Sequence, residues 1–203
     1  MKTGSFSRLI DAVVHGQTKV VSRLLTADPG LAKEQAGAGA TRQHAAEFFF
    51  EEIGHYLYSG DTALHMAAAA FERPAAQLLV RHGALCRVRN RRGAEPLHYA
   101  ADANRWKPAA QRRTIEFLLT AGADPNALDK SGVAPLHRAV RTRSSPAVRA
   151  LLSGGADVNL KNGRGSTPLN LARHDTGRGG SGSARARREQ LEIITILLDA
   201  GAR

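Results

Sequence analysis

Thr62-Ala-Leu-His65 is the first clear copy of a four-residue pattern that recurs along this chain. The pattern returns as Glu95-Pro-Leu-His98, Ala134-Pro-Leu-His137 and Thr167-Pro-Leu-Asn170, with a degenerate copy at Ser7-Arg-Leu-Ile10. Its leucines fall at positions 9, 64, 97, 136 and 169, so the intervals are 55, 33, 39 and 33 residues. The interval of 33 residues occurs twice and defines the unit, and a fixed period of this length is typical of stacked repeat proteins.

A second marker, Gly-Ala, follows an apolar segment in four places with the same underlying unit: Gly83, Gly122, Gly155 and Gly201. Both markers have local physical reasons, since Thr167 can cap a helix start, Pro168 fits the first helical position, and glycine suits a left-handed helix end. Apolar clusters such as residues 117–119 recur at helical spacing and predict a second helix in each unit. One pair of helices cannot bury its apolar face alone, so we expect the units to stack on one another.

The two markers together resemble the ankyrin repeat, most closely at Gly-Ala-Asp-Pro-Asn (residues 122–126) and Gly-Ala-Asp-Val-Asn (residues 155–159). The resemblance implies an all-α solenoid of about five helix-turn-helix units, with β-turn or hairpin fingers. It covers nearly the whole chain as one domain, apart from three insertions. We place a degenerate repeat 1 at about 5–35, an insertion at about 36–58, and repeats 2 to 5 at about 59–91, 92–130, 131–163 and 164–203.

The 22-residue excess between the first two repeats contains an aromatic-rich segment, residues 45–58, which has the composition of a helix. In such a helix Phe48, Phe49 and Phe50 cannot all face the same way. Two roles for the insertion stay open. The segment packs over the N-terminal repeats and shields their core, or it recognises a partner.

Composition and charge narrow the classes of function. The 203 residues include 29 Lys and Arg against 18 Asp and Glu, and the net charge of +11 favours acidic proteins, nucleic acid or anionic lipid. Cys86 is the only cysteine, which excludes an intramolecular disulfide and a zinc site built on several cysteines. We find no apolar run of signal-peptide or membrane-spanning length, and therefore expect a cytoplasmic protein and a monomer.

The resemblance to ankyrin repeats implies that partners bind the finger tips and the concave face of the first helices. The corresponding finger-tip positions here are Arg91, Arg92, Lys130, Ser131, Arg164 and Ser166. The concave positions are Asp102, Arg141, Thr142, His174 and Asp175. We expect a protein partner with an acidic or mixed surface, and nucleic acid or another polyanion is the alternative. A polar face that only keeps the protein soluble is the simplest rival interpretation.

Two smaller insertions, near residues 105–111 and 176–188, fall between the two helices of repeats 3 and 5. We expect both at the edge opposite the fingers, where they form a candidate second surface: Trp106, Lys107, Arg178, Arg185, Arg187 and Arg188. Trp106 is either a local packing anchor or an interface contact. Whether the 176–188 insertion recognises a partner or only links two helices also stays open.

The residues that could carry chemistry have structural explanations. His65, His98 and His137 occupy one position of successive repeats, where histidines in ankyrin-like units make structural hydrogen bonds rather than bind metal. Cys86 lies where ankyrin repeats place a buried valine, so we expect a core thiol. The sequence contains no nucleophile-elbow pattern and no acidic pair with tuned neighbours. We therefore expect no catalytic residue, no metal and no cofactor, and a protein that is not an enzyme.

Overall fold

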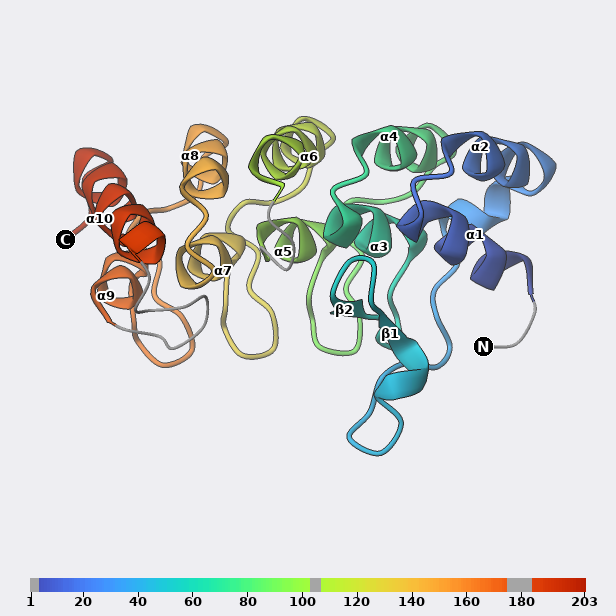
Figure 1. The fold of residues 1–203 in the computed structure, drawn as a ribbon, viewed down its shortest axis with the longest axis horizontal. Coiled ribbons are helices and arrows are strands. Elements are labelled where there is room, and N and C mark those ends of the chain that lie inside the picture. The colour runs from blue at the N-terminus through green and yellow to red at the C-terminus, as the bar shows by residue number, and fades with distance from the viewer. Residues whose placement is uncertain (1–3, 103–106, 175–183) are drawn as a thin grey trace.

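A computed structural model describes residues 4–102, 107–174 and 184–203 of the chain. Ten α-helices lie within these residues and form five successive pairs (Figure 1). The pairs are α1 (Ser5–Val14) with α2 (Thr18–Ala27), α3 (Ala63–Ala70) with α4 (Arg73–Arg81), α5 (Pro96–Ala101) with α6 (Pro108–Thr120), α7 (Pro135–Arg141) with α8 (Ser145–Ser153), and α9 (Pro168–Arg173) with α10 (Ala184–Asp199).

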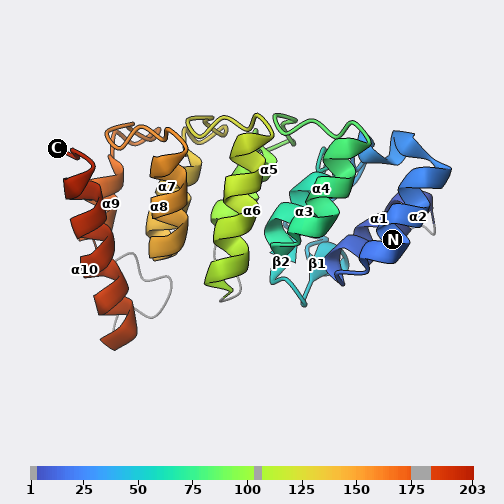
Figure 2. The same cartoon turned by 90° about the horizontal axis from the view of Figure 1, so that it is seen from above.

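The helices form two parallel rows, with the first helix of each pair in one row and the second helix in the other (Figures 1 and 2). Each first helix contacts the next one, from α1 to α3 and onward to α9. The repeated leucines, from Leu9 to Leu169, are at most 1% exposed and join one continuous core. The predicted solenoid is therefore confirmed, because the pattern residues occupy equivalent places in successive layers.

The repeated histidines tie the layers together. In His65, His98 and His137 the ring Nδ1 accepts a hydrogen bond from the backbone N–H three residues earlier, at 3.1, 3.1 and 3.2 Å. The Nε2 of each ring donates to a backbone carbonyl just before the first helix of the next repeat, at 3.1, 3.0 and 3.3 Å. One ring thus completes its own helix start and fixes the next repeat, as the structural interpretation of these histidines predicted.

The fingers are tight turns closed by side chains. Asn90, Asp129 and Asn162 each accept hydrogen bonds from the backbone N–H groups two and four residues later. Backbone hydrogen bonds also join neighbouring fingers, with N···O distances of 2.9, 3.0 and 3.1 Å between successive fingers. Gly132 shows how close this approach is, because a Cβ there would lie 2.5 Å from the backbone nitrogen of the next finger. The fingers therefore form one hydrogen-bonded row.

The insertion after repeat 1 differs from the helix that its composition indicated. A 3-10 turn, η1 (Pro29–Ala32), follows α2, and a second, η2 (Ala46–Phe48), leads into an antiparallel ribbon of β1 (Phe49–Phe50) and β2 (His55–Tyr56). Successive residues of a strand face opposite sides, which resolves the conflict within the phenylalanine run. Phe50 is buried whereas Phe49 is 42% exposed.

The β1–β2 ribbon lies beside α3, on the side of the first helices (Figure 1). Phe50, Ile53 and Leu57 join the hydrophobic core. The segment therefore packs on the N-terminal repeats, as one of its two expected roles requires. Its outward-facing residues stay available for the other role.

Two further expectations concern the core and the membrane. Cys86 is buried, and burial raises the pKa of its thiol, which disfavours the nucleophilic thiolate. This position is the core thiol that the repeat pattern predicted. Among the helices of the described residues, none combines the length and the apolar character needed to cross a bilayer.

Candidate binding surface

The finger tips present a row of cations. Arg91, Arg92, Lys130 and Arg164 are exposed, as is Ser131, whereas Ser166 is half-buried. The backbone N–H of Lys130 donates to the carbonyl of Arg92 at 3.0 Å, so these two tips are held next to each other. The structure thus brings the six sequence-predicted tip residues onto one rim of the solenoid.

The concave candidates are less uniform. Arg141 and Thr142 lie half-buried at the end of α7, and His174 is exposed after α9. The Thr142 hydroxyl donates a hydrogen bond to the carbonyl of Arg138, at 2.9 Å. Asp175 lies outside the described residues.

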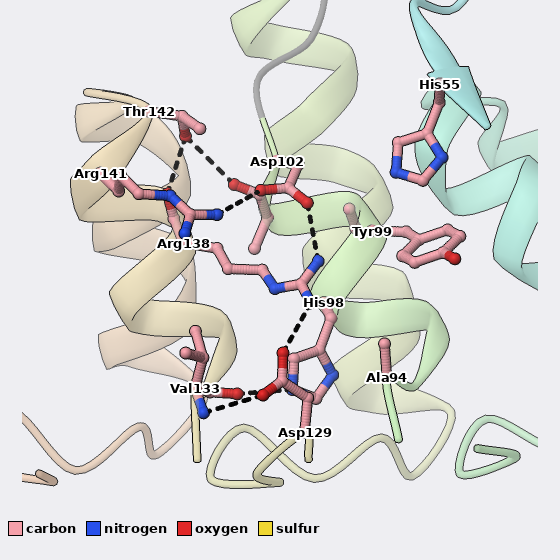
Figure 3. Close-up of polar contacts among 12 residues, drawn as sticks. His55, Ala94, His98, Tyr99, Asp102, Asp129, Val133, Arg138, Arg141 and Thr142 are labelled. Atoms are coloured by element: carbon pink, nitrogen blue, oxygen red, sulfur yellow. Dashed lines mark hydrogen bonds and ion pairs between the residues drawn. The ribbon is translucent and has the colours of Figure 1, made fainter. Parts of the chain in front are cut away.

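Asp102 has an internal role that its sequence position did not reveal. Its side chain is 13% exposed, and the carboxylate accepts from the Arg138 guanidinium at 2.7 Å, with Arg141 3.6 Å from its other oxygen. Arg138, which belongs to repeat 4, also donates to Asp129 at 2.8 Å, so one buried arginine bridges two carboxylates of the preceding repeat (Figure 3). Asp102 therefore orients the guanidiniums of Arg138 and Arg141, and little of its carboxylate is left for a partner.

Electrostatics hold this bridge in its charged form. Burial alone would raise the pKa of Asp129, but hydrogen bonds from Arg138 and from two backbone N–H groups keep that pKa below its ordinary value. Sequence reasoning missed Arg138 because an arginine on a helix is usually solvated. The available signal was its place directly after the repeat histidine, on a helix face that stacks against α5.

The buried histidines are neutral, with their nitrogens already engaged. Burial lowers the pKa of His98 to about 4, and the nearby charge of Arg138 acts in the same direction. Burial also lowers the pKa of His65 and His137. Throughout the described parts of the chain, no three His, Cys, Asp or Glu side chains are grouped so that they could hold a metal ion.

The β1–β2 ribbon is anchored to the third repeat by a polar contact set at its base. The His55 ring packs on Tyr99 of α5, with ring centroids 4.3 Å apart. Asp61 is fully buried and accepts from the Tyr99 hydroxyl at 3.0 Å and from the backbone N–H of Tyr58 at 2.6 Å. The ribbon therefore lies beside α3 and contacts α5 through His55, whereas α7 and α9 lie farther along the row of first helices (Figure 1).

The second candidate surface is described only in part. Lys107 is exposed at the start of α6, and Arg187 and Arg188 are exposed in α10. The helix ends that flank both inserted segments lie along the edge opposite the finger turns (Figure 2). The candidates Trp106 and Arg178 and the side chain of Arg185 lie outside what the structure describes.

Comparison with known proteins identifies the repeat. Family descriptions of ankyrin repeats match residues 9–108 (three copies), 92–130 (a single repeat) and 118–172 (many copies). The chain belongs to the ankyrin repeat family. Its ankyrin repeats place the pattern leucines and histidines in the layers described above, and the insertion ribbon and the Asp102–Arg138–Asp129 bridge are built onto them.

Several curated proteins are similar to this ankyrin chain over part of their length. The mouse B-cell lymphoma 3 protein homolog is 38% identical over 57% of this chain and 25% of its own length. Human ankyrin repeat and SOCS box protein 6 is 36% identical over 62% of this chain and 29% of its own length. Zebrafish neurogenic locus notch homolog protein 1 is 33% identical over 56% of this chain and 6% of its own length. The chain thus matches less than a third of each of these relatives.

Proposed function

We propose that this ankyrin chain is a non-enzymatic scaffold that binds a protein partner through its basic finger tips and the concave helix face. The observation that carries the proposal is the row of exposed cations on fingers that are hydrogen-bonded to one another. Such a row is preorganised, so little conformational entropy is lost when a partner binds. Stacked repeats use their extended concave surface in the same way.

The chemistry of the row favours an acidic or mixed partner surface. The chain carries a net charge of +11, and Asp102 and Asp129 are engaged by Arg138. Complementary charges mainly raise the association rate and make binding sensitive to salt. With its lone thiol buried and no disulfide to form, we place this scaffold in the cytoplasm as a monomer.

Charge reversal at the tips tests the proposal. Affinity purification with mass spectrometry identifies a partner, and its binding is then measured for the variant Arg91→Glu/Arg92→Glu/Arg164→Glu. We expect a loss of about tenfold or more in affinity, mostly in the association rate at low salt. The control variant makes the same charge change at exposed arginines of the second helices: Arg23→Glu/Arg73→Glu/Arg113→Glu. Unchanged binding by the finger variant, or equal losses in both variants, would show that the tips are not the binding surface.

The same exposed cations favour nucleic acid or another polyanion as the second candidate. Titrating duplex and single-stranded DNA at two salt concentrations separates the two functions. Phosphate contacts give a steep, sequence-independent salt slope. Tight DNA binding that is lost in the finger variant would show that the finger tips bind a polyanion rather than a protein partner.

A further inference from the structure

A row of aromatic and arginine side chains connects the inserted ribbon to the finger that carries Arg91 and Arg92. The rings of Phe49 and Tyr56 pair across the two strands, with centroids 4.7 Å apart. Tyr56 and Tyr58 follow at 6.2 Å. The guanidinium carbons of Arg92 and Arg91 lie 4.9 and 5.7 Å from the Tyr58 ring centroid. These five residues are called the aromatic-arginine row.

Most of the row lies outside the core, although Tyr58 also packs against it. Phe49 is 42% exposed, Tyr56 and Tyr58 are half-buried, and both arginines are exposed. The other side of the ribbon, through Phe50, already supplies its anchor in the core. An exposed phenylalanine paired with a tyrosine therefore has no necessary role in burial of the repeats.

The two guanidiniums are held in place while they remain able to bind anions. A guanidinium over a ring directs its N–H groups outward in its own plane, where they match a carboxylate. Arg91 also donates to the carbonyl of Ala40, which fixes it further. Within the described part of the chain, the Arg92 guanidinium makes no ion pair, and Lys130 lies on the adjacent finger.

We propose that the aromatic-arginine row is a hot spot for an acidic protein segment that also carries an apolar side chain. The carboxylates bind Arg91 and Arg92, and the apolar side chain packs on Phe49 and Tyr56. Aromatic residues and arginine dominate interface energetics because they combine large contact area with oriented polar groups. The inference rests on the proposed function, and it names the partner chemistry and adds the ribbon to the finger surface.

The ring arrangement favours a protein segment over stacked bases. Phe49 and Tyr56 are tilted by 48° against each other, and the face of Tyr58 is occupied by guanidiniums. Base stacking in single-strand binding needs open ring faces. Tilted, partly covered rings instead present edges and a shallow apolar surface that suits side chains.

Selection from a phage-displayed library of random dodecapeptides on the full chain provides the test. We expect enrichment of peptides that combine Asp or Glu with an aromatic or aliphatic residue. Fluorescence anisotropy should show binding about tenfold weaker in Phe49→Ala/Tyr56→Ala, and weaker still in Arg91→Glu/Arg92→Glu. The matched control, Leu85→Ala/Leu191→Ala, removes exposed apolar side chains elsewhere and should bind within about twofold of the unaltered chain.

Circular dichroism confirms folding of each variant, and the single change Phe49→Ala replaces the double variant if Tyr56→Ala unfolds the ribbon. The inference is overturned if no acidic, apolar peptides are enriched, or if those peptides bind the aromatic variant undiminished. It is also overturned if oligothymidine binds the row in their place. Suppose that a cellular partner loses binding to the finger variant Arg91→Glu/Arg92→Glu/Arg164→Glu but still binds Phe49→Ala/Tyr56→Ala. That result would refute the hot spot and leave the proposed function standing.

Discussion

Acidification should destabilise this protein through its buried histidines, and His98 allows the size of the effect to be worked out. Its ring is fully buried, with Nδ1 accepting from the backbone N–H of Glu95 and Nε2 donating to the carbonyl of Val133. Protonation would place a second ring N–H against a backbone N–H. The folded state therefore resists protonation of His98 while the unfolded chain does not.

The pKa of His98 falls from 6.5 to about 4 on folding. Below pH 6.5 the unfolded chain binds more protons than the folded chain, so stability is full above that pH and is lost as the pH falls towards 4. One pKa unit corresponds to about 1.36 kcal/mol, which gives a loss of about 2 kcal/mol by pH 5 and about 3 kcal/mol by pH 4. The lowered pKa values of His65 and His137 act in the same direction.

Urea denaturation followed by circular dichroism at pH 7.5, 6 and 5 measures this loss. The comparison variant is His98→Asn, since Asn170 occupies the equivalent place in the last repeat and cannot be protonated there. We expect His98→Asn to be less stable at pH 7.5 and to lose about 2 kcal/mol less than the unaltered chain between pH 7.5 and 5. Carboxylates that titrate in the same range affect both proteins equally. If both proteins lose the same free energy of unfolding between pH 7.5 and 5, His98 is not the neutral, hydrogen-bonded ring that makes the fold sensitive to acid.

Three further predictions concern stability. Arg138→Met should lower the free energy of unfolding by about 3–5 kcal/mol, because the carboxylates of Asp102 and Asp129 lose their shared partner. The control Arg149→Met removes an exposed ion pair and should lower it by at most about 1 kcal/mol. Equal losses in the two variants would contradict the bridge. Gly122→Ala should cost about 1–2 kcal/mol through its left-handed backbone, with φ of 93° and no close neighbour. Gly132→Ala should cost more because its Cβ meets the next finger, and the reverse order in melting temperature would refute the contact. Ile53→Ala should cost about 2–5 kcal/mol if the ribbon is part of the core, and an unchanged unfolding midpoint would show that it is not.

The repeat period alone determined the architecture. Leucines and histidines that recur with a basic unit of 33 residues, lengthened by insertions, must meet their equivalents in a stack, because one helical pair cannot bury its own apolar face. The left-handed glycines follow from the same period, and the resemblance to ankyrin repeats implied the structural role of His65, His98 and His137 and the core position of Cys86. The finger tips, Arg91 to Arg164, were also placed by register with the repeat.

The features that interrupt the period depend on contacts between distant parts of the chain. The composition of residues 45–58 indicated a helix, whereas the fold pairs Phe49–Phe50 with His55–Tyr56 in a ribbon that buries Phe50 and leaves Phe49 42% exposed. Asp102 reads as an exposed concave residue until Arg138, from the next repeat, is seen to bind it. Such contacts join residues far apart in the sequence. Their energies depend on burial and on interatomic distance, and the local sequence pattern specifies neither of them.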